Sequence, residues 1–329
     1  MLHSNRSIYP YSVSKLQCQY SMHFDNKDFD QLLSVRPLFN EAEVYTNEVV
    51  GSSNGLVCLF CVYENNNQFI SVIKYSQYID KLVIWNPFIR KSFMIPERPC
   101  CSPPLGSSDS KLIGFGFDSR LNDYKLLVAH YLISSIKGVV LYSLNSNSWK
   151  KITNATPSCR YYIDFFYSSA FVVDGRFYWP MLNKNLRKML LVFDLRDEMF
   201  GEISLPAYLE NDRSTNLTIK TFGESSIAVI VRNGFYEYDI WVMKEYETRE
   251  WMKLARVGKR WREFSNLLEF RDNGEMLIYF FKRQRLASYS LNGHMKNLLA
   301  WRGEKDGRWP SFAYRCVESL ALLDKGNDS

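Results

Sequence analysis

A strand–turn–strand pattern recurs along this 329-residue chain and constrains its fold more than any other feature. At four places an Asn-Gly or Asp-Gly pair adjoins runs of β-branched and aromatic residues. Both residues of such a pair accept positive φ at low cost, as a two-residue hairpin turn requires. The pairs are Asn54-Gly55, Asp174-Gly175, Asn233-Gly234 and Asn273-Gly274. The pattern predicts an all-β chain built from hairpins.

A second unit follows each hairpin and consists of an apolar strand, a short polar turn and a further strand. An aromatic residue closes the first of these strands in five copies, at intervals of 57, 51, 48 and 48 residues. A period near 50 with four short strands per unit predicts the blades of a kelch-like β-propeller, although no double glycine marks the start of a unit. The five aromatics are Trp85, Tyr142, Phe193, Trp241 and Tyr289.

The two ends of the chain carry strand-like residues that belong to no complete unit. Five complete units lie within 49–301. Pairing of the ends would remove the open edge of an incomplete propeller. We therefore expect a single domain over 1–329 with about six blades, in which 1–48 and 310–324 contribute to the closing blade. Helix signals are weak, and one short helix is expected around 26–33 behind an Asn or Asp cap.

Composition and charge exclude several classes of protein. The chain has 41 basic and 35 acidic residues, and its net charge of +6 is spread along the sequence. Nucleic-acid-binding domains cluster such charge on one face, so no nucleic-acid partner is expected. The longest apolar run, 56–63, is of strand length, which predicts no membrane partner. Seven scattered cysteines and the lack of a secretory signal favour the cytoplasm or nucleus.

No motif predicts a catalytic, metal or cofactor site. Cys58 and Cys61 lie in an apolar run with no second pair of cysteines, whereas structural zinc needs four ligands. Gly114 and Gly116 lack the third glycine and the helix of a phosphate loop, so we expect them to permit close strand packing. None of the histidines has a partner at metal spacing. They are His3, His23, His130 and His294.

Two aromatic and basic loops are the candidate partner-binding residues. Loops held by a rigid scaffold often carry binding function, and Trp and Arg are enriched at interaction hot spots. Ordinary solvated loop ends are the alternative for both. A further basic group, Lys282, Arg283 and Arg285, has the same two interpretations. The candidates are Arg160, Tyr161 and Tyr162 in one loop and Arg260, Trp261 and Arg262 in the other.

Seven motifs in order resemble the F-box-associated domain of plant F-box proteins, a group that includes S-locus F-box and F-box/kelch-repeat proteins. Each motif is weak alone, but together they span nearly the whole chain. They are GSSNGLVCL (51–59), IWNPFIRK (84–91), GFGFDSRLNDYKLL (114–127), LYSLNSNSWKKI (141–152), VDGRFYW (173–179), LVFDLRDEMFGEISLP (191–206) and VESLALL (317–323).

The resemblance implies a substrate receptor of an SCF-type E3 ubiquitin ligase. In that family the F-box recruits Skp1 and the associated domain binds the protein to be ubiquitinated. Residues 2–7 resemble the stretch that follows an F-box, so the chain is expected to lack one. Skp1 and cullin are then partners only of a longer form. One alternative is a remnant or competitor that binds targets without recruiting Skp1. A propeller enzyme is another, but no motif supports it.

Overall fold

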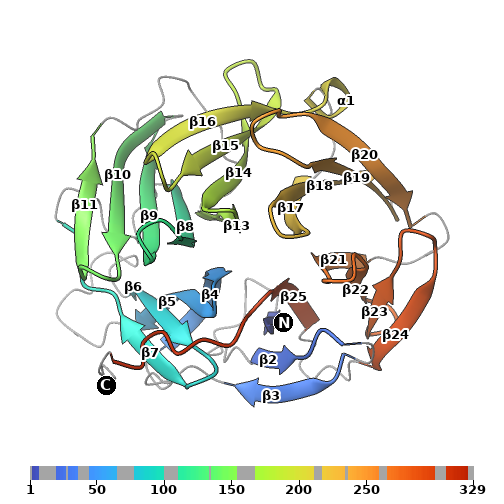
Figure 1. Ribbon diagram of the computed structural model, residues 1–329, viewed down its shortest axis with the longest axis horizontal. Coiled ribbons are helices and arrows are strands. Elements are labelled where there is room, and N and C mark those ends of the chain that lie inside the picture. Colours follow the sequence, from blue (N-terminus) through green and yellow to red (C-terminus); the bar gives the residue numbers. More distant parts are fainter. Residues whose placement is uncertain are drawn as a thin grey trace. The chain divides into compact units, whose positions relative to one another are not determined.

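Strands dominate the computed structural model. One four-residue helix, α1 (Ala207–Glu210), lies among the described residues, and no helix there is long and apolar enough to cross a membrane. The strands form six sheets (Figure 1), which confirms the prediction of an all-β propeller. The described ranges are 2–6, 20–26, 29–35, 44–64, 78–99, 110–132, 135–153, 167–210, 217–233, 236–258, 265–300 and 309–324.

Five of the six sheets are built from strands that are consecutive in the chain, as the five repeat units predict. The remaining sheet is composite, because β25 (Trp309–Tyr314) pairs antiparallel with β1 (Leu2–Arg6). The two ends of the chain therefore pair. Five blades are continuous in sequence, fewer than the expected number of about six, and the composite sheet joins the two ends of the chain.

Contacts divide the chain into two compact units. Unit 1 lies within 1–12, 18–35 and 205–315, and unit 2 lies within 13–17, 36–204 and 316–329. Each unit contains three sheets. A single domain over 1–329 remains a prediction.

Unit 2 contains three sheets in which successive strands pair antiparallel, except that β12 runs parallel to β8. The first is β4 (Val44–Ser53), β5 (Leu56–Glu64), β6 (Tyr78–Asn86) and β7 (Lys91–Met94). The second is β8 (Ser110–Asp118), β9 (Asp123–Leu132), β10 (Ser135–Ser143), β11 (Ser148–Ile152) and β12 (Tyr167–Ser169). The third is β13 (Phe171–Val173), β14 (Arg176–Leu182), β15 (Lys188–Asp194) and β16 (Met199–Ser204).

Unit 1 contains α1 and three antiparallel sheets. One is β17 (Leu217–Phe222), β18 (Ser226–Asn233), β19 (Glu237–Met243) and β20 (Trp251–Val257). The next is β21 (Ser265–Phe270), β22 (Met276–Phe280), β23 (Arg285–Tyr289) and β24 (Met295–Ala300). The composite sheet has β2 (Tyr20–His23) and β3 (Gln31–Val35) beyond β25 and β1.

The aromatic residues of the predicted repeat occupy equivalent strands in the structure. The five spaced aromatics all lie on the third strand of their sheets, β6, β10, β15, β19 and β23. Trp85, Tyr142 and Phe193 are fully buried. The repeat period therefore marks the third strand of the five continuous sheets, and in unit 2 it also marks a core position.

The predicted hairpin turns also form. Asn54-Gly55 and Asp174-Gly175 have positive φ at both residues, as two-residue turns require. Asn273 and Gly274 lie in a longer turn between β21 and β22, where Gly274 has positive φ. Asn233 ends β18, and its partner Gly234 lies outside the described residues.

The predicted helix at 26–33 is wrong. Asn26 does act as a local cap, because its Oδ1 accepts a hydrogen bond from Asp30 N. The bond closes a turn that holds Phe29 fully buried at a φ of 54°. The chain then continues as β3, which pairs with β2. Strand pairing overrides an eight-residue helix signal here, since short helices gain little by themselves.

The cores lie between adjacent sheets within each unit. In unit 2 one cluster joins Ile84 of β6 to Phe115 of β8, and a second joins Leu127 of β9 to Trp179 of β14. In unit 1 the sheets pack in the same way, with Ile240 of β19 against Phe270 of β21. Burying both faces of each sheet is what stabilises blades that could not fold alone.

Gly114 and Gly116 serve close packing, as the sequence predicts. A Cβ built on Gly114 would lie 2.7 Å from a ring atom of Phe177, and one on Gly116 would lie 2.8 Å from the same ring. Phe177 of β14 therefore packs directly on the backbone of β8.

We expect Gly114→Ala to lower the free energy of unfolding by about 1–3 kcal/mol through overpacking against Phe177. Adding Phe177→Leu should recover part of the loss, so a double-mutant cycle in chemical denaturation should show coupling between the sites. Gly138→Ala on β10 is the matched control, since its Cβ would have nothing within 4 Å. Equal costs at both glycines, or no coupling, would contradict the packing argument.

Candidate functional site

The loop residues predicted to bind a partner lie outside the described residues. This applies to Arg160, Tyr161 and Tyr162 and to Arg260, Trp261 and Arg262. Their role remains a prediction. Of the further basic group, Lys282 and Arg283 are exposed, whereas Arg285 donates to Asn297 Oδ1 at 2.5 Å and lies over the Phe280 ring. Arg285 thus has a structural role.

The described turns at one end of the unit 2 sheets share a capping arrangement. Asn86, Asp118 and Asp194 each end a strand, and each side-chain oxygen accepts hydrogen bonds from the two backbone N–H groups that follow in the turn. Asx turns of this kind fix the chain where the strand ends. The turns after Asn86 and Asp194 close with positive φ at Arg90 and Glu198.

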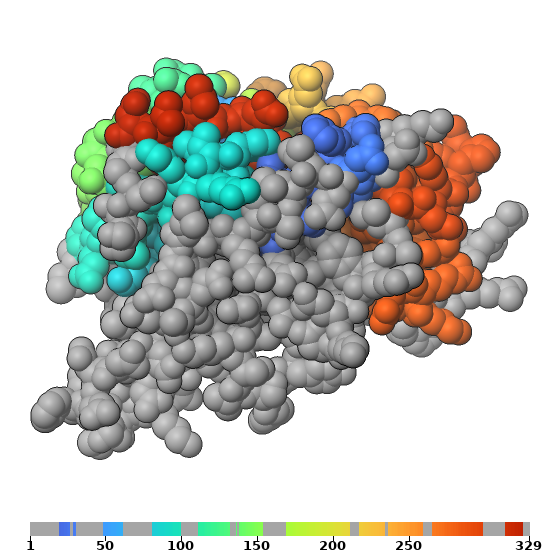
Figure 2. Space-filling model, turned by 90° about the horizontal axis from the view of Figure 1, so that it is seen from below, coloured from blue at the N-terminus to red at the C-terminus, as the bar shows by residue number. Residues whose placement is uncertain are grey.

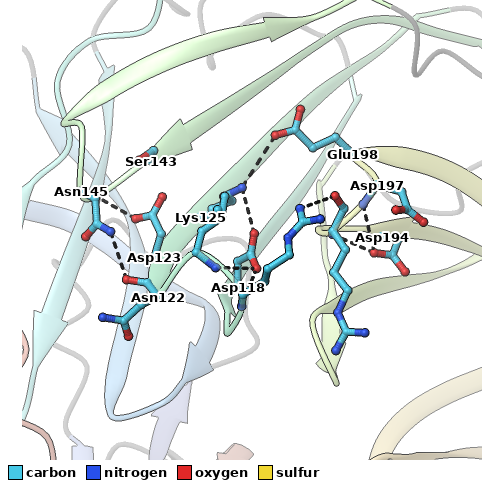
Figure 3. A network of polar contacts seen from close by, with 12 residues as sticks. Asp118, Asn122, Asp123, Lys125, Ser143, Asn145, Asp194, Asp197 and Glu198 are labelled. Atoms are coloured by element: carbon cyan, nitrogen blue, oxygen red, sulfur yellow. Dashed lines mark hydrogen bonds and ion pairs between the residues drawn. The ribbon is translucent and has the colours of Figure 1, made fainter.

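A buried lysine links two of these turns. The Lys125 ammonium lies between Asp118 at 3.1 Å and Glu198 at 3.7 Å (Figure 3). Burial raises the pKa of Asp118, but its bonds to Lys125 and to two backbone N–H groups outweigh this and hold the pKa below its usual value. Arg120 also donates to the Arg196 carbonyl at 2.6 Å. These contacts fasten the β8–β9 turn to the β15–β16 turn.

Residues 316–324, here called the C-terminal strap, cross the neighbouring turns of unit 2. Asn86 Nδ2 donates to the carbonyls of Ser319 and Ala321, and Lys91 Nζ donates to that of Leu323 at 2.7 Å. Figure 2 shows the strap in dark red lying on the cyan surface formed by residues around β6 and β7. The strap is therefore held on the turns through its backbone.

The strap directs three aliphatic side chains to solvent. Val317, Leu320 and Leu323 are 53%, 70% and 52% exposed, and we call these three side chains the aliphatic ridge. Leu322 points the other way, is buried and belongs to the core between the β4–β7 and β8–β12 sheets. One side chain anchors the strap while three face outward. The sequence predicts that 310–324 contributes to the closing blade; β25 does pair with β1, whereas the motif at 317–323 lies in unit 2.

Two buried ionic groups stabilise unit 1. Asp239 of β19 is 1% exposed and accepts from Arg256 at 2.6 and 2.7 Å, with Lys253 at 3.0 Å. Glu269 of β21 is buried near Lys220 of β17. Burial raises the pKa of Glu269 to about 6, against the opposing charge of Lys220. Both side chains are buried and their opposite charges interact, which fits a structural role.

Stability should fall in acid through Asp239. Burial raises its pKa, but the bonds and charges of Arg256 and Lys253 outweigh this, so the folded-state pKa is lowered. The carboxylate therefore contributes stability above about pH 4, and the contribution is lost as pH falls through the lowered pKa. Asp239→Asn should cost about 1.5–3 kcal/mol at pH 7 and flatten the acid limb of the stability–pH curve. An unchanged acid limb in denaturation measurements would contradict this.

The described residues contain no cluster of three or more His, Cys, Asp or Glu side chains arranged to hold a metal ion. Cys58 and Cys61 are buried free thiols, and burial raises the pKa of Cys58 well above its usual value, which disfavours a reactive thiolate. His130 is buried with Arg98 Nη1 3.4 Å from its Nε2, and His23 stacks on Phe29. The surroundings of these two cysteines and two histidines fit a structural role.

Comparison with known proteins identifies the family. The family model for the F-box associated beta propeller domain matches residues 5–313. The Arabidopsis thaliana F-box protein At3g07870 is 28% identical over 77% of this chain and 66% of its own length. The F-box protein CPR1 of the same plant is 26% identical over 64% of this chain and 52% of its own length. The chain thus spans less than two thirds of the length of these relatives.

Similarity to solved structures is low. The β-propeller domain of the Trilobed protease from Pyrococcus furiosus is 13% identical, with a TM-score of 0.43 over 78% of this chain and 83% of that one. Nothing about function follows from that likeness. The match of the family model over most of the sequence does carry a conclusion: the chain belongs to the F-box associated beta propeller domain family.

Proposed function

We propose that this chain recognises target proteins for an SCF-type ubiquitin ligase, and that it binds them without catalysing a reaction. Family membership and the F-box proteins among its relatives support this role. The observation that carries the proposal is the aliphatic ridge on the strap of unit 2. Recruitment of Skp1 and cullin would require an F-box. The proposal places the protein in the cytoplasm or nucleus.

The ridge has the chemistry of a protein contact. Three large aliphatic side chains within seven residues are exposed by half or more, and such gatherings favour interaction sites. The exposed acids Glu318 and Asp324 flank them on the strap. Charge complementarity therefore favours a target surface that sets basic groups beside apolar ones.

Quantitative affinity capture tests the proposal. The tagged chain, its Leu320→Asp variant and its Leu186→Asp variant are expressed in plant cells under proteasome inhibition, and retained proteins are compared. Leu186 is a matched control, because it is 46% exposed and lies in the β14–β15 turn at the opposite end of its sheet. We expect at least one protein to be retained by the wild type and by Leu186→Asp but reduced about tenfold by Leu320→Asp, as loss of an anchor predicts.

The captured protein must also behave as a ligase target. Its lifetime should shorten when the wild-type protein, in a form that carries an F-box, is raised in the cell. The lifetime should be unaffected by the Leu320→Asp form. The proposed function would be contradicted if the wild type retained no protein above background. It would also be contradicted if neither substitution changed the amount of any retained protein.

A further inference from the structure

Asn86 uses its whole side-chain amide in two tasks. Its Oδ1 accepts from Phe88 N at 3.0 Å and Ile89 N at 3.4 Å, which caps the β6–β7 turn. Its Nδ2 donates one hydrogen to the Ser319 carbonyl at 2.9 Å and the other to the Ala321 carbonyl at 2.8 Å. Both N–H donors of the Asn86 amide therefore bond to the strap, which is more than 230 residues away in sequence.

The corresponding turns show why the residue is asparagine. Asp118 and Asp194 cap their turns with a carboxylate oxygen in the same way, so the cap itself accepts either residue. A carboxylate at position 86 would keep the cap but would present an acceptor to two strap carbonyls. The strap therefore requires the amide N–H donors of asparagine at position 86, whereas the turn could be capped by an aspartate as well.

Gly55 is the second residue that the strap constrains, because the strap leaves no room for a side chain there. It has a φ of +86°, and a Cβ there would lie 2.3 Å from Ser319 Cβ and 2.7 Å from the Val317 carbonyl oxygen. Gly175 occupies the same place in the Asp174-Gly175 turn with a φ of +69°, but its Cβ would meet nothing closer than 3.9 Å. A side chain at either position strains the turn, and at Gly55 it also displaces the strap.

Two of the strap's backbone N–H groups bond within the strap. Ala321 N donates to Ser319 Oγ at 3.1 Å, and Leu323 N donates to the Leu320 carbonyl at 2.9 Å. Together with the bonds from Asn86 and Lys91 to the carbonyls of Ser319, Ala321 and Leu323, these contacts hold the backbone of the strap. The aliphatic ridge then faces solvent without further ordering when a partner binds, which lowers the entropic cost of association.

We propose that Asn86 and Gly55 are positioning residues for target recognition: they hold the strap so that Val317, Leu320 and Leu323 meet the target in a fixed arrangement. This inference rests on the proposed function. Neither residue needs to touch the target. The partner is the one argued above, a protein surface with apolar side chains beside basic groups.

Hydrogen exchange and capture on the same variants test the inference. In Asn86→Asp and Gly55→Ala, amides of 317–324 should exchange at least about tenfold faster than in the wild type, because local opening becomes easier. In Gly175→Ala the strap should exchange as in the wild type. Capture of the target should fall in the first two variants and persist in the third. Exchange in β8, β9 and β14 reports whether each variant remains folded.

The outcomes separate the two proposals. A strap that stays protected in Asn86→Asp overturns the positioning role, and so does a loosened strap with undiminished capture. Equal strap exchange in Gly55→Ala and Gly175→Ala overturns the part assigned to Gly55. If the wild type captures no target, the proposed function fails, while exchange of the strap still decides whether Asn86 and Gly55 hold it.

Discussion

Replacing Arg271 with alanine is expected to lower the free energy of unfolding by about 3–5 kcal/mol, the cost of breaking a buried charge network. The guanidinium is 2% exposed and joins the β21–β22 turn to the loop between β2 and β3 in unit 1. It bonds to Asp25 at 2.7 Å, to Ser288 Oγ at 2.9 Å and to the Asn26 carbonyl. It also lies over the Phe29 ring. Chemical denaturation measures the loss.

Two further variants serve as comparisons for Arg271→Ala. Arg271→Lys keeps the charge but loses the forked geometry, so it should fall between the wild type and alanine. Lys282→Ala removes an exposed charge in the same sheet and should change stability by less than about 0.5 kcal/mol. A loss at Arg271 no larger than at Lys282 would show that the network contributes little.

Trp179→Ala should cost a similar amount, about 3–5 kcal/mol, by emptying the core between the second and third sheets of unit 2. The side chain is fully buried, with the Phe177 and Phe200 rings 6.0 and 6.2 Å from its own. The residue lies mid-strand on β14, so the vacated space has little freedom to collapse. The measurement is again denaturation, with the transition slope recorded to check that cooperativity survives.

Trp251→Ala is the natural comparison. Trp251 begins β20 in unit 1 and is only partly buried, so its removal should cost clearly less. The sequence treats both tryptophans alike as strand aromatics. If Trp251 proved the costlier of the two, the assignment of the core between β9 and β14 would be wrong.

Periodic features of this fold were predictable because they arise from local chemistry. Trp85 and its four counterparts lie on the third strand of the five continuous sheets, and in unit 2 the aromatic is a buried core residue. Asn54-Gly55 and Asp174-Gly175 form the turns that their positive φ allows. Gly114 and Gly116 are small because Phe177 lies on them.

The strap could not be predicted in the same way. Its position depends on Asn86 reaching Ser319 and Ala321, a contact between residues 233 and 235 positions apart. No local pattern distinguishes an asparagine that only caps a turn from one that also donates to a distant carbonyl. The contact of Lys125 with Glu198 and that of Arg271 with Asp25 belong to the same class. Such contacts follow from how sheets pack, which the strand pattern leaves open.

Contact between the aliphatic ridge and a target protein is tested most directly by site-specific photocrosslinking. A photoreactive residue is placed at Leu320 in one protein and at Leu186 in another, and each is irradiated in plant cells under proteasome inhibition. We predict crosslinks to a discrete target from position 320 that are absent from position 186 and lost in the Asn86→Asp background. Crosslinks of equal yield from both positions, or none from position 320, would contradict the account.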